Sequence, residues 1–495
     1  MRIRRLIALA TATIAAMLPA AGQTLSPLDF GLREASGPMG RYYALYNTHT
    51  EAERRGVEVS YEGIDSLSIE LPLGWKSIPL GRRTDFGGLV LTVTNRAAHG
   101  TLFRMAGEGQ AIELEKSNVD ALDFRSVAAL AKGTHLLALR DNNAWTERQG
   151  YGYKVYRSDL IVVRDGIGEN PPIAPWNTEA TSMSATMYTP DTTPGLVANL
   201  TMHRTKESTY KTNCIGISGQ INVSIEHVKV TTPRSRMIAD GVFSISSSAH
   251  ITLSDDTVHG TYSGYGSTRN YGYAFSMSNV YGATFKRVEA YGNWGVFGTN
   301  NLCNTRLEDC EVDRFDIHCY GRDAHLVRCT LQGRQTQFSS MYGTVRYDSC
   351  YFVDCVPLRT RSDYNSFTPF RIEMHDCTFR LTPRYHALVD VTLKDTGDNP
   401  RPELREKHWP TLQVDGLTVI VPLTVGAMNI YHPMGNYDCL KRSYEAPAEV
   451  SLRGLRTVRA SGREVRLPVK LSTKPFRTKQ DYPFTIEYTT DAPVL

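Results

Sequence analysis

A short alternation of apolar and polar positions recurs through the middle of the chain. Each copy ends with a cysteine followed by one or two further strand residues, and successive cysteines are 19, 21 and 27 residues apart. A short apolar strand that recurs about every 20 residues is typical of a solenoid, because one repeat cannot bury its apolar face until the next stacks on it. The four copies are Leu307–Val312, Leu326–Leu331, Arg346–Phe352 and Ile372–Phe379, with Cys310, Cys329, Cys350 and Cys377.

The same register extends beyond the cysteines in both directions. Upstream, Val228, Thr257 and Val288 take the cysteine position, and downstream residues 412–419 and 450–457 echo each other. The spacing varies, so coils of one length carry loops of different lengths, where recognition residues are commonly built. No helical period occurs within the repeats, and the Asn-containing consensus of leucine-rich repeats is missing. We therefore expect an all-β chain folded as a parallel β-helix.

The repeated cysteines are expected to form an inward ladder. Stacked coils place equivalent residues about 4.8 Å apart, and free Cys is small, apolar and commonly buried. A zinc site is disfavoured because no CxxC or HxxH spacing appears, and we predict no metal ligands. Disulfides between neighbouring cysteines are the remaining alternative, but they would need unusual geometry.

The N-terminus and the composition indicate an exported protein. Residues 1–22 have a basic start, an apolar stretch and small residues at a plausible cleavage point, as a signal peptide does. No later segment is apolar enough to span a bilayer, so we expect a periplasmic or secreted protein without membrane insertion. The net charge of +4 over 495 residues is too small to suggest nucleic acid as the main partner.

The mature chain divides into three parts. Residues 23–190 are expected to form an N-terminal cap and the first coils, residues 191–425 the regular β-helix, and residues 426–495 a C-terminal coil and β cap. Within the first part, the pattern of residues 41–55 predicts a helix that ends at Gly56. Strands are expected to follow at 57–61 and 67–72.

The opening of the mature chain carries a resemblance to a known family. An Asp29-Phe30-Gly31 start, a capping helix, a glycine and then the first strands resemble the opening of the pectate-lyase-like superfamily, which includes polysaccharide lyases, polygalacturonase-type hydrolases and phage tailspikes. The resemblance implies a right-handed single-stranded parallel β-helix with an N-terminal capping helix and β-rich flanking segments. Leu32 and residues 37–40 depart from the family's usual continuation, so it supports the fold and no particular activity.

Residues around His318 form the sharpest site hypothesis. Side chains alternate along a strand, so His318 and Tyr320 are expected on one face, with Ile317 and Cys319 on the other. Arg322 follows just beyond. A base, a phenol and a guanidinium on one surface suit β-elimination from a uronic acid: His318 takes the proton, Tyr320 protonates the departing oxygen and Arg322 neutralises the carboxylate. The rival interpretation is that His318 and Tyr320 are half-buried ladder members.

Aromatic, amide and basic residues near this strand are candidates for sugar binding, because flat aromatic faces stack on sugar rings. The predicted substrate-binding residues are Arg269, Tyr271, Asn293, Trp294, Asn300, Tyr342 and Arg346.

The candidate catalytic and substrate-binding residues together favour a lyase that acts on an acidic polysaccharide. One alternative is a glycoside hydrolase with two carboxylates, for which the acidic residues of the coils are candidates; a second is a carbohydrate-binding solenoid without catalysis. Lyases of the superfamily more often use a Lys or Arg base with calcium, so calcium stays a possible cofactor. The oligomeric state stays open. The carboxylate candidates are Asp240, Asp255, Asp256, Glu308, Asp309, Asp313, Asp316 and Asp323.

Overall fold

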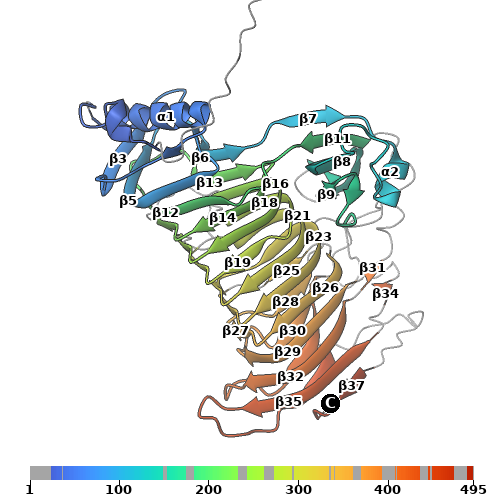
Figure 1. Ribbon diagram of the computed structural model, residues 1–495. Coiled ribbons are helices and arrows are strands. Elements are labelled where there is room, and N and C mark those ends of the chain that lie inside the picture. The colour runs from blue at the N-terminus through green and yellow to red at the C-terminus, as the bar shows by residue number, and fades with distance from the viewer. Residues whose placement is uncertain are drawn as a thin grey trace, which may run out of the picture.

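Stacked coils make up most of the chain, with a helix at the N-terminal end of the stack and a small separate sheet beside its first coils (Figure 1). The computed structural model describes residues 24–35, 37–148, 153–173, 183–231, 242–260, 273–292, 295–333, 336–338, 341–360, 370–392, 407–408, 410–434, 444–445, 449–472 and 488–493. Within these ranges, twenty-eight strands form one continuous sheet that winds from coil to coil in parallel register. The predicted parallel β-helix is confirmed.

Each regular coil contributes to three faces, which we call A, B and C in chain order. Face A carries the site described below. It consists of β4 (Ile78–Pro79), β6 (Gly100–Ala106), β13 (Thr212–Ser218), β18 (Tyr273–Tyr281), β25 (Gln337–Phe338), β28 (Leu358–Thr360), β30 (Ala387–Thr392), β33 (Met428–Met434), β36 (Val469–Ser472) and the first parts of β16 (Phe243–Ser254), β21 (Gly295–Glu308) and β23 (Asp316–Val327).

Faces B and C follow, and several long strands run from one face into the next. Face B contains the later parts of β16, β21 and β23, together with β14 (Ile221–Glu226), β19 (Thr284–Lys286), β26 (Met341–Asp348), β37 (Tyr488–Thr490) and the first parts of β5 (Arg83–Asn95), β12 (Gly195–Arg204), β29 (Arg371–Arg380), β32 (Thr411–Ile420) and β35 (Val450–Val458). Face C contains the later parts of those five strands and β3 (Ser66–Leu71), β15 (Lys229–Thr231), β17 (Thr257–His259), β20 (Glu289–Tyr291), β22 (Glu311–Val312), β24 (Thr330–Gln332) and β27 (Tyr351–Val353).

The cysteine ladder stands at the bend between faces B and C. Cys310, Cys329, Cys350 and Cys377 are all buried in the main core, and all eight cysteines among the described residues are free thiols. The residue before each of them has a positive φ of about 50°, which turns the chain sharply between two strands. The predicted inward ladder is confirmed.

One member of the ladder differs from the prediction. Lys229 pairs with Thr257 across the coils, so the residue before Thr257, Asp256, is the one that aligns with Val228. Asp256 is fully buried in this otherwise apolar column, and its Oδ1 accepts a hydrogen bond from the backbone N–H of Val228 at 2.8 Å. The sequence register was therefore one residue out at this coil.

A second ladder fills the inside of face A. Five phenylalanine rings from successive coils pack against one another, with centroid distances of 4.8–5.6 Å, the separation that aromatic pairs prefer. Phe297, from the coil before His318, is one of these core rings. The ladder consists of Phe243, Phe275, Phe297, Phe315 and Phe338.

The N-terminal end of the stack is covered by α1 (Gly37–Arg55), which ends at Gly56 with φ +65°, as predicted. It follows the short helix η1 (Pro27–Phe30), and β1 (Thr24–Leu25) pairs with β2 (Glu58–Val59). Buried side chains of α1, among them Leu45 and Ala52, join the main core. The helix covers the first coil and hides its apolar end.

An antiparallel sheet is inserted between β6 and β12, and we call it the flanking sheet. Its order is β10 (Ile167–Gly168), β9 (Tyr153–Arg164), β8 (Thr134–Arg148), β11 (Met183–Tyr188) and β7 (Gly109–Ile112), with α2 (Lys116–Ala121) beside it. It has an apolar core of its own, and Leu136, Leu160 and Val162 pack against Ile221 and Ala249 of the coils. A further short pair, β31 (Lys407–His408) and β34 (Tyr444–Glu445), forms a two-stranded sheet that does not pair with the main sheet.

Candidate active site

Polar side chains follow one another along the outside of face A. The register pairs Asp316 with Gln337, Gln337 with Arg359, Arg359 with Asp390 and Asp390 with His432. Coils in a β-helix are about 4.8 Å apart, so these five residues form a strip parallel to the axis of the stack. Arg359 and Asp390 form an ion pair at 2.6 Å, and His432 Nδ1 lies 3.2 Å from the other Asp390 oxygen. We call this set the face A strip.

The N-terminal end of the strip carries an acid–base cluster. Arg314, Asp316 and His318 alternate with the core residues Phe315 and Ile317, so all three point outward. The Arg314 guanidinium forms an ion pair with Asp316 and also donates a hydrogen bond to Gln337 Oε1 at 3.0 Å. Asp316 has no exposed side-chain area, whereas the His318 side chain is 13% exposed.

His318 is held between a carboxylate and a phenol. Its Nε2 lies 3.4 Å from Asp316 Oδ2 and 3.3 Å from the Tyr273 hydroxyl, and the Tyr273 ring meets the imidazole edge to face. His318 falls at an irregularity in the pairing between β21 and β23, where the partners shift by one residue. Such a bulge re-aims a side chain out of the regular ladder. A buried carboxylate beside an imidazole stabilises its protonated form, so this arrangement can accept, hold and return a proton.

Tyr320 does not share this surface, and the prediction that it does is wrong. Its φ of +28° bends the strand, and its side chain is buried with Cys303, Cys319 and Ile173. The hydroxyl accepts a hydrogen bond from the backbone N–H of Ser158 and donates one to its C=O, both at 2.6 Å. Burial raises the pKa of Tyr320 well above its usual range. Tyr320 therefore fastens the flanking sheet to the coils.

Three other predicted residues lie away from His318. The Arg322 guanidinium donates to the carbonyl of Pro172 at 3.0 Å, which ties the flanking segment down a second time. Tyr342 pairs in register with Arg322 and packs on the buried Tyr320 cluster. Arg346 lies on face B, where it forms an ion pair with Asp348 at 2.9 Å. Arg269, Tyr271, Asn293 and Trp294 fall outside the described residues, as does the predicted signal peptide.

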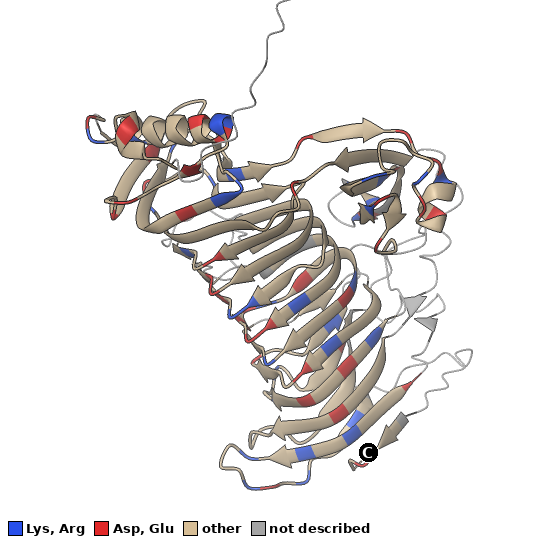
Figure 2. Cartoon of the chain, viewed as in Figure 1, with Lys and Arg blue, Asp and Glu red and all other residues tan. Residues whose placement is uncertain are grey.

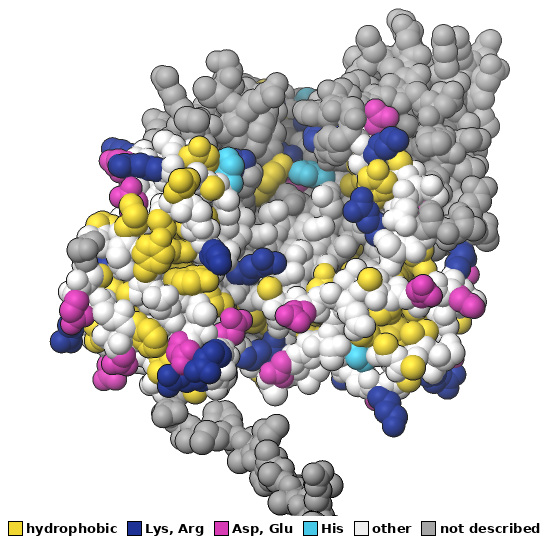
Figure 3. Space-filling view, turned by 90° about the horizontal axis from the view of Figure 1, so that it is seen from above, with side chains coloured by type: hydrophobic (Ala, Val, Ile, Leu, Met, Phe, Trp, Pro, Cys, Tyr) yellow, Lys and Arg dark blue, Asp and Glu magenta, His cyan; other side chains and the backbone are white. Residues whose placement is uncertain are grey.

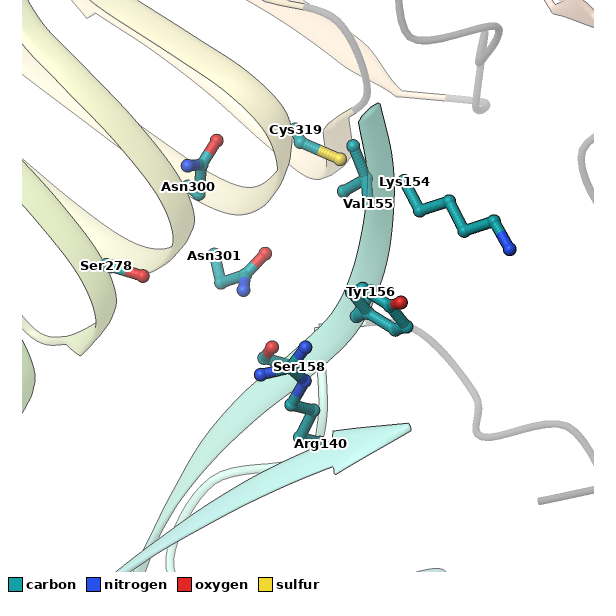
Figure 4. Close-up of a pocket in the computed structure, with 9 residues that line it drawn as sticks. All are labelled: Arg140, Lys154, Val155, Tyr156, Ser158, Ser278, Asn300, Asn301 and Cys319. Carbon is teal, nitrogen blue, oxygen red and sulfur yellow. The ribbon is translucent and has the colours of Figure 1, made fainter. Parts of the chain in front are cut away.

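Asn300 lines a cavity between face A and the flanking sheet. The cavity has a volume of about 260 Å³ and lies next to His318 in the chain, since Cys319 is part of its wall (Figure 4). The coils contribute Ser278, Asn300, Asn301 and Cys319; strands β8 and β9 contribute Arg140, Lys154, Val155, Tyr156 and Ser158. In the close-up, Arg140 extends toward Ser158 and the coil residues, whereas the Lys154 side chain points away from them.

Arg140 is placed by its neighbours. Its guanidinium carbon lies 4.4 Å from the centroid of the Tyr156 ring, a cation–π contact, and Arg140 pairs in register with Ser158. In the view from above, Lys, Arg and His side chains lie around the hollowed middle of the molecule (Figure 3). Arg140 could not be predicted from the repeat pattern, because Arg140 belongs to the inserted flanking sheet and not to a coil.

Most of the carboxylates considered for hydrolysis have structural partners. Asp255 pairs with Arg287 and Asp309 with Arg328, each ion pair at 2.6 Å and joining neighbouring coils. Asp313 and Asp323 accept hydrogen bonds from backbone N–H groups of adjacent coils, Glu308 pairs with Arg306, and Asp256 is buried in the ladder. Of the described candidates, Asp316 alone lies in the strip. Asp240 lies outside the described residues.

Face B carries a second network of charges. Arg306 Nη1 donates to His325 Nδ1 at 2.7 Å, and His325 Nε2 lies 2.6 Å from Asp348, which also pairs with Arg346. Acidic and basic residues alternate across neighbouring coils there (Figure 2). Arg306, His325 and Arg346 are aligned in register on successive coils, with His325 in the middle. Each charge in this network already has an opposite neighbour.

Neither a metal site nor a membrane-spanning helix is found among the described residues. They contain no group of three His, Cys, Asp or Glu side chains placed to hold a metal ion. None of the helices resolved in the described ranges is both long and apolar enough to cross a membrane.

The architecture and this surface define a parallel β-helix protein with a polar strip along one face, and the comparisons agree on the fold. No family model and no curated protein sequence matches the chain. Among solved structures, it is similar to the Gp54 tailspike of Acinetobacter baumannii bacteriophage AP22, solved with a capsular saccharide, with a TM-score of 0.54 and 9% identity over 94% of this chain and 79% of the tailspike. This similarity supports the parallel β-helix fold and nothing finer.

Two further solved structures are similar to this chain with TM-scores below 0.5, and no conclusion is drawn from them. The gp49 tailspike of Pseudomonas phage LKA1 matches with a TM-score of 0.43 and 12% identity over 91% of this chain and 83% of that one. An α-1,3-glucanase from Streptomyces thermodiastaticus matches with a TM-score of 0.36 and 9% identity over 78% of this chain and 93% of that one.

Proposed function

We propose that the protein is an exported polysaccharide lyase that cleaves a uronic-acid-containing polymer by β-elimination. The observation that carries this proposal is the contact of one imidazole nitrogen, His318 Nε2, with both a buried carboxylate and a phenol at the end of the face A strip. The shared fold with a tailspike that was solved with a capsular saccharide supports a carbohydrate as the substrate.

His318 and Tyr273 act as the acid–base pair. His318 takes the proton from C5 of the uronate, the electrons of that C–H bond form the C4–C5 double bond, and the C4–O bond breaks. Tyr273 gives its proton to the departing oxygen. The 3.3 Å contact between Tyr273 and His318 then returns the proton and restores the pair for the next turnover.

The surrounding groups stabilise the charges that develop. Asp316 lies beside the imidazole and stabilises it while it is protonated. The Arg140 guanidinium and the Asn300 amide line the neighbouring cavity, where they can bind a carboxylate of the polymer and balance its charge. Tyr273 is thus the proton donor to the departing oxygen, the role that the sequence suggested for Tyr320.

The test is a screen of polygalacturonate, alginate and hyaluronan, with and without added calcium, followed by ultraviolet absorbance of the unsaturated product. We expect absorbance to rise with the wild-type protein and to stay flat with His318→Ala. The matched control is His325→Ala, a histidine of face B, which should keep full activity. Reducing ends without the chromophore would make the protein a hydrolase, and binding without cleavage of any glycan would make it a binding solenoid.

A further inference from the structure

The flanking sheet contacts the coils that precede the face A strip. Strands β8 and β9 contact β16 and β18 of the coils, whereas the strip runs from Asp316 toward later coils and away from this sheet. A polymer that follows the strip toward His318 therefore reaches the cavity one or two coils further on, at Asn300 and Ser278, and then meets the flanking sheet.

The cavity has the size and the lining for one acidic sugar. At about 260 Å³ it is smaller than pockets for drug-sized ligands, which begin near roughly 300 Å³. None of its nine described lining residues is acidic. Arg140 supplies a guanidinium that suits a carboxylate, while Asn300, Asn301 and Ser278 supply amides and a hydroxyl for sugar hydroxyl groups.

The wall of the cavity is firmly attached to the coils. Two hydrogen bonds join Ser158 to Tyr320, and Arg322 holds Pro172. Within the flanking segment itself, Asp159 Oδ1 accepts a hydrogen bond from the backbone N–H of Ile173 at 2.9 Å. These contacts are buried or partly buried, so among the described residues they close the passage between Ser158 and the coil at Tyr320.

We propose that this cavity binds the terminal uronate of the polymer and that the enzyme releases short products from a chain end. This inference rests on the proposed function, and it adds that Arg140 and Asn300 determine specificity for an acidic chain end. The bond cleaved at His318 then lies a fixed, small number of sugars from that end.

The first experiment tests the cavity without requiring turnover. Galacturonate, glucuronate and their neutral counterparts galactose and glucose are titrated into the protein by calorimetry. We expect one of the uronates to bind more tightly than its neutral counterpart, and Arg140→Ala to weaken that binding roughly tenfold or more. The control is Arg164→Ala, an exposed arginine of β9 paired with Glu169, which should bind as wild type does. Equal binding of acidic and neutral sugars, or no effect of Arg140→Ala, would overturn the site.

The second experiment follows product size on the polymer cleaved in the screen. Release from an end gives one short product from the first minutes, with a slow fall in viscosity. A ladder of all sizes with a rapid fall in viscosity would show cleavage within the chain, which would refute the end-binding cavity and leave the lyase proposal standing. If none of the polymers is cleaved, the lyase proposal fails for them, and the titration still decides whether the cavity binds a uronate.

Discussion

Tyr273 stands beside His318, in the place that the sequence suggested for Tyr320. Simple alternation put Tyr320 beside His318, but a one-residue pairing shift and a positive φ at Tyr320 turn it under the flanking sheet. Tyr273 lies 45 residues earlier and reaches His318 from another coil. Neither the bulge nor a contact between non-adjacent coils follows from a period-two pattern.

Substituting the two tyrosines separates their roles. Tyr273→Phe removes the hydroxyl at His318 Nε2, and we expect turnover to fall by about 100-fold or more with stability nearly unchanged. Tyr320→Phe leaves the Ser158 backbone groups without their partner, so we expect a loss of about 1–3 kcal/mol in the free energy of unfolding, with the pH dependence of turnover preserved. Denaturant unfolding and pH–rate profiles of both variants check this. The opposite pattern would restore Tyr320 as the proton donor.

Asp256 is a carboxyl group in an apolar ladder. Burial raises its pKa well above its usual range, so the folded protein holds a proton that the unfolded chain releases above about pH 4. The folded state therefore loses stability as the pH rises from there toward the folded pKa. Asp256→Asn keeps an acceptor for Val228 and cannot ionise.

We expect the stability of Asp256→Asn relative to wild type to rise as the pH rises above about 4, measured by urea unfolding at several pH values. Asp255→Asn is the matched control. The Arg287 guanidinium lowers the pKa of Asp255, so removing this carboxylate should cost stability that grows as the pH rises through the acid range. A pH-independent difference for Asp256→Asn would mean that Asp256 is not protonated in the folded protein.

At the scale of the element, the bend between faces B and C accepts any small apolar residue. Val228, Val288 and the cysteines occupy equivalent buried positions, each after a residue with positive φ. Cys350→Val should therefore change the free energy of unfolding by less than about 1.5 kcal/mol. Cys350→Ser places a hydroxyl in the same apolar column and should cost more, about 1–3 kcal/mol. Both variants are compared by thermal unfolding. An equal loss of stability in Cys350→Val and Cys350→Ser would contradict the view that this position needs only a small apolar side chain.

At the scale of the whole molecule, the parts that repeat could be predicted from the sequence and the part that does not repeat could not. The coil register, the ladder and α1 follow from local patterns that recur or carry a clear stop such as Gly56. The sequence singled out His318 as a base and Asp316 as one carboxylate among eight, but it did not group them with Arg314. The flanking sheet pairs only with itself, and nothing in its strands states which coil it covers. The cavity and Arg140 depend on that placement.

The central claim is that His318 and Tyr273 carry out β-elimination at the end of the face A strip. The most direct measurement is the initial rate of ultraviolet absorbance on the polymer that the wild-type protein cleaves, compared among His318→Ala, Tyr273→Phe and His325→Ala. The rate should be lost in the first two variants and kept in the third. Wild-type rates in His318→Ala or Tyr273→Phe, with the fold intact by circular dichroism, would contradict the claim.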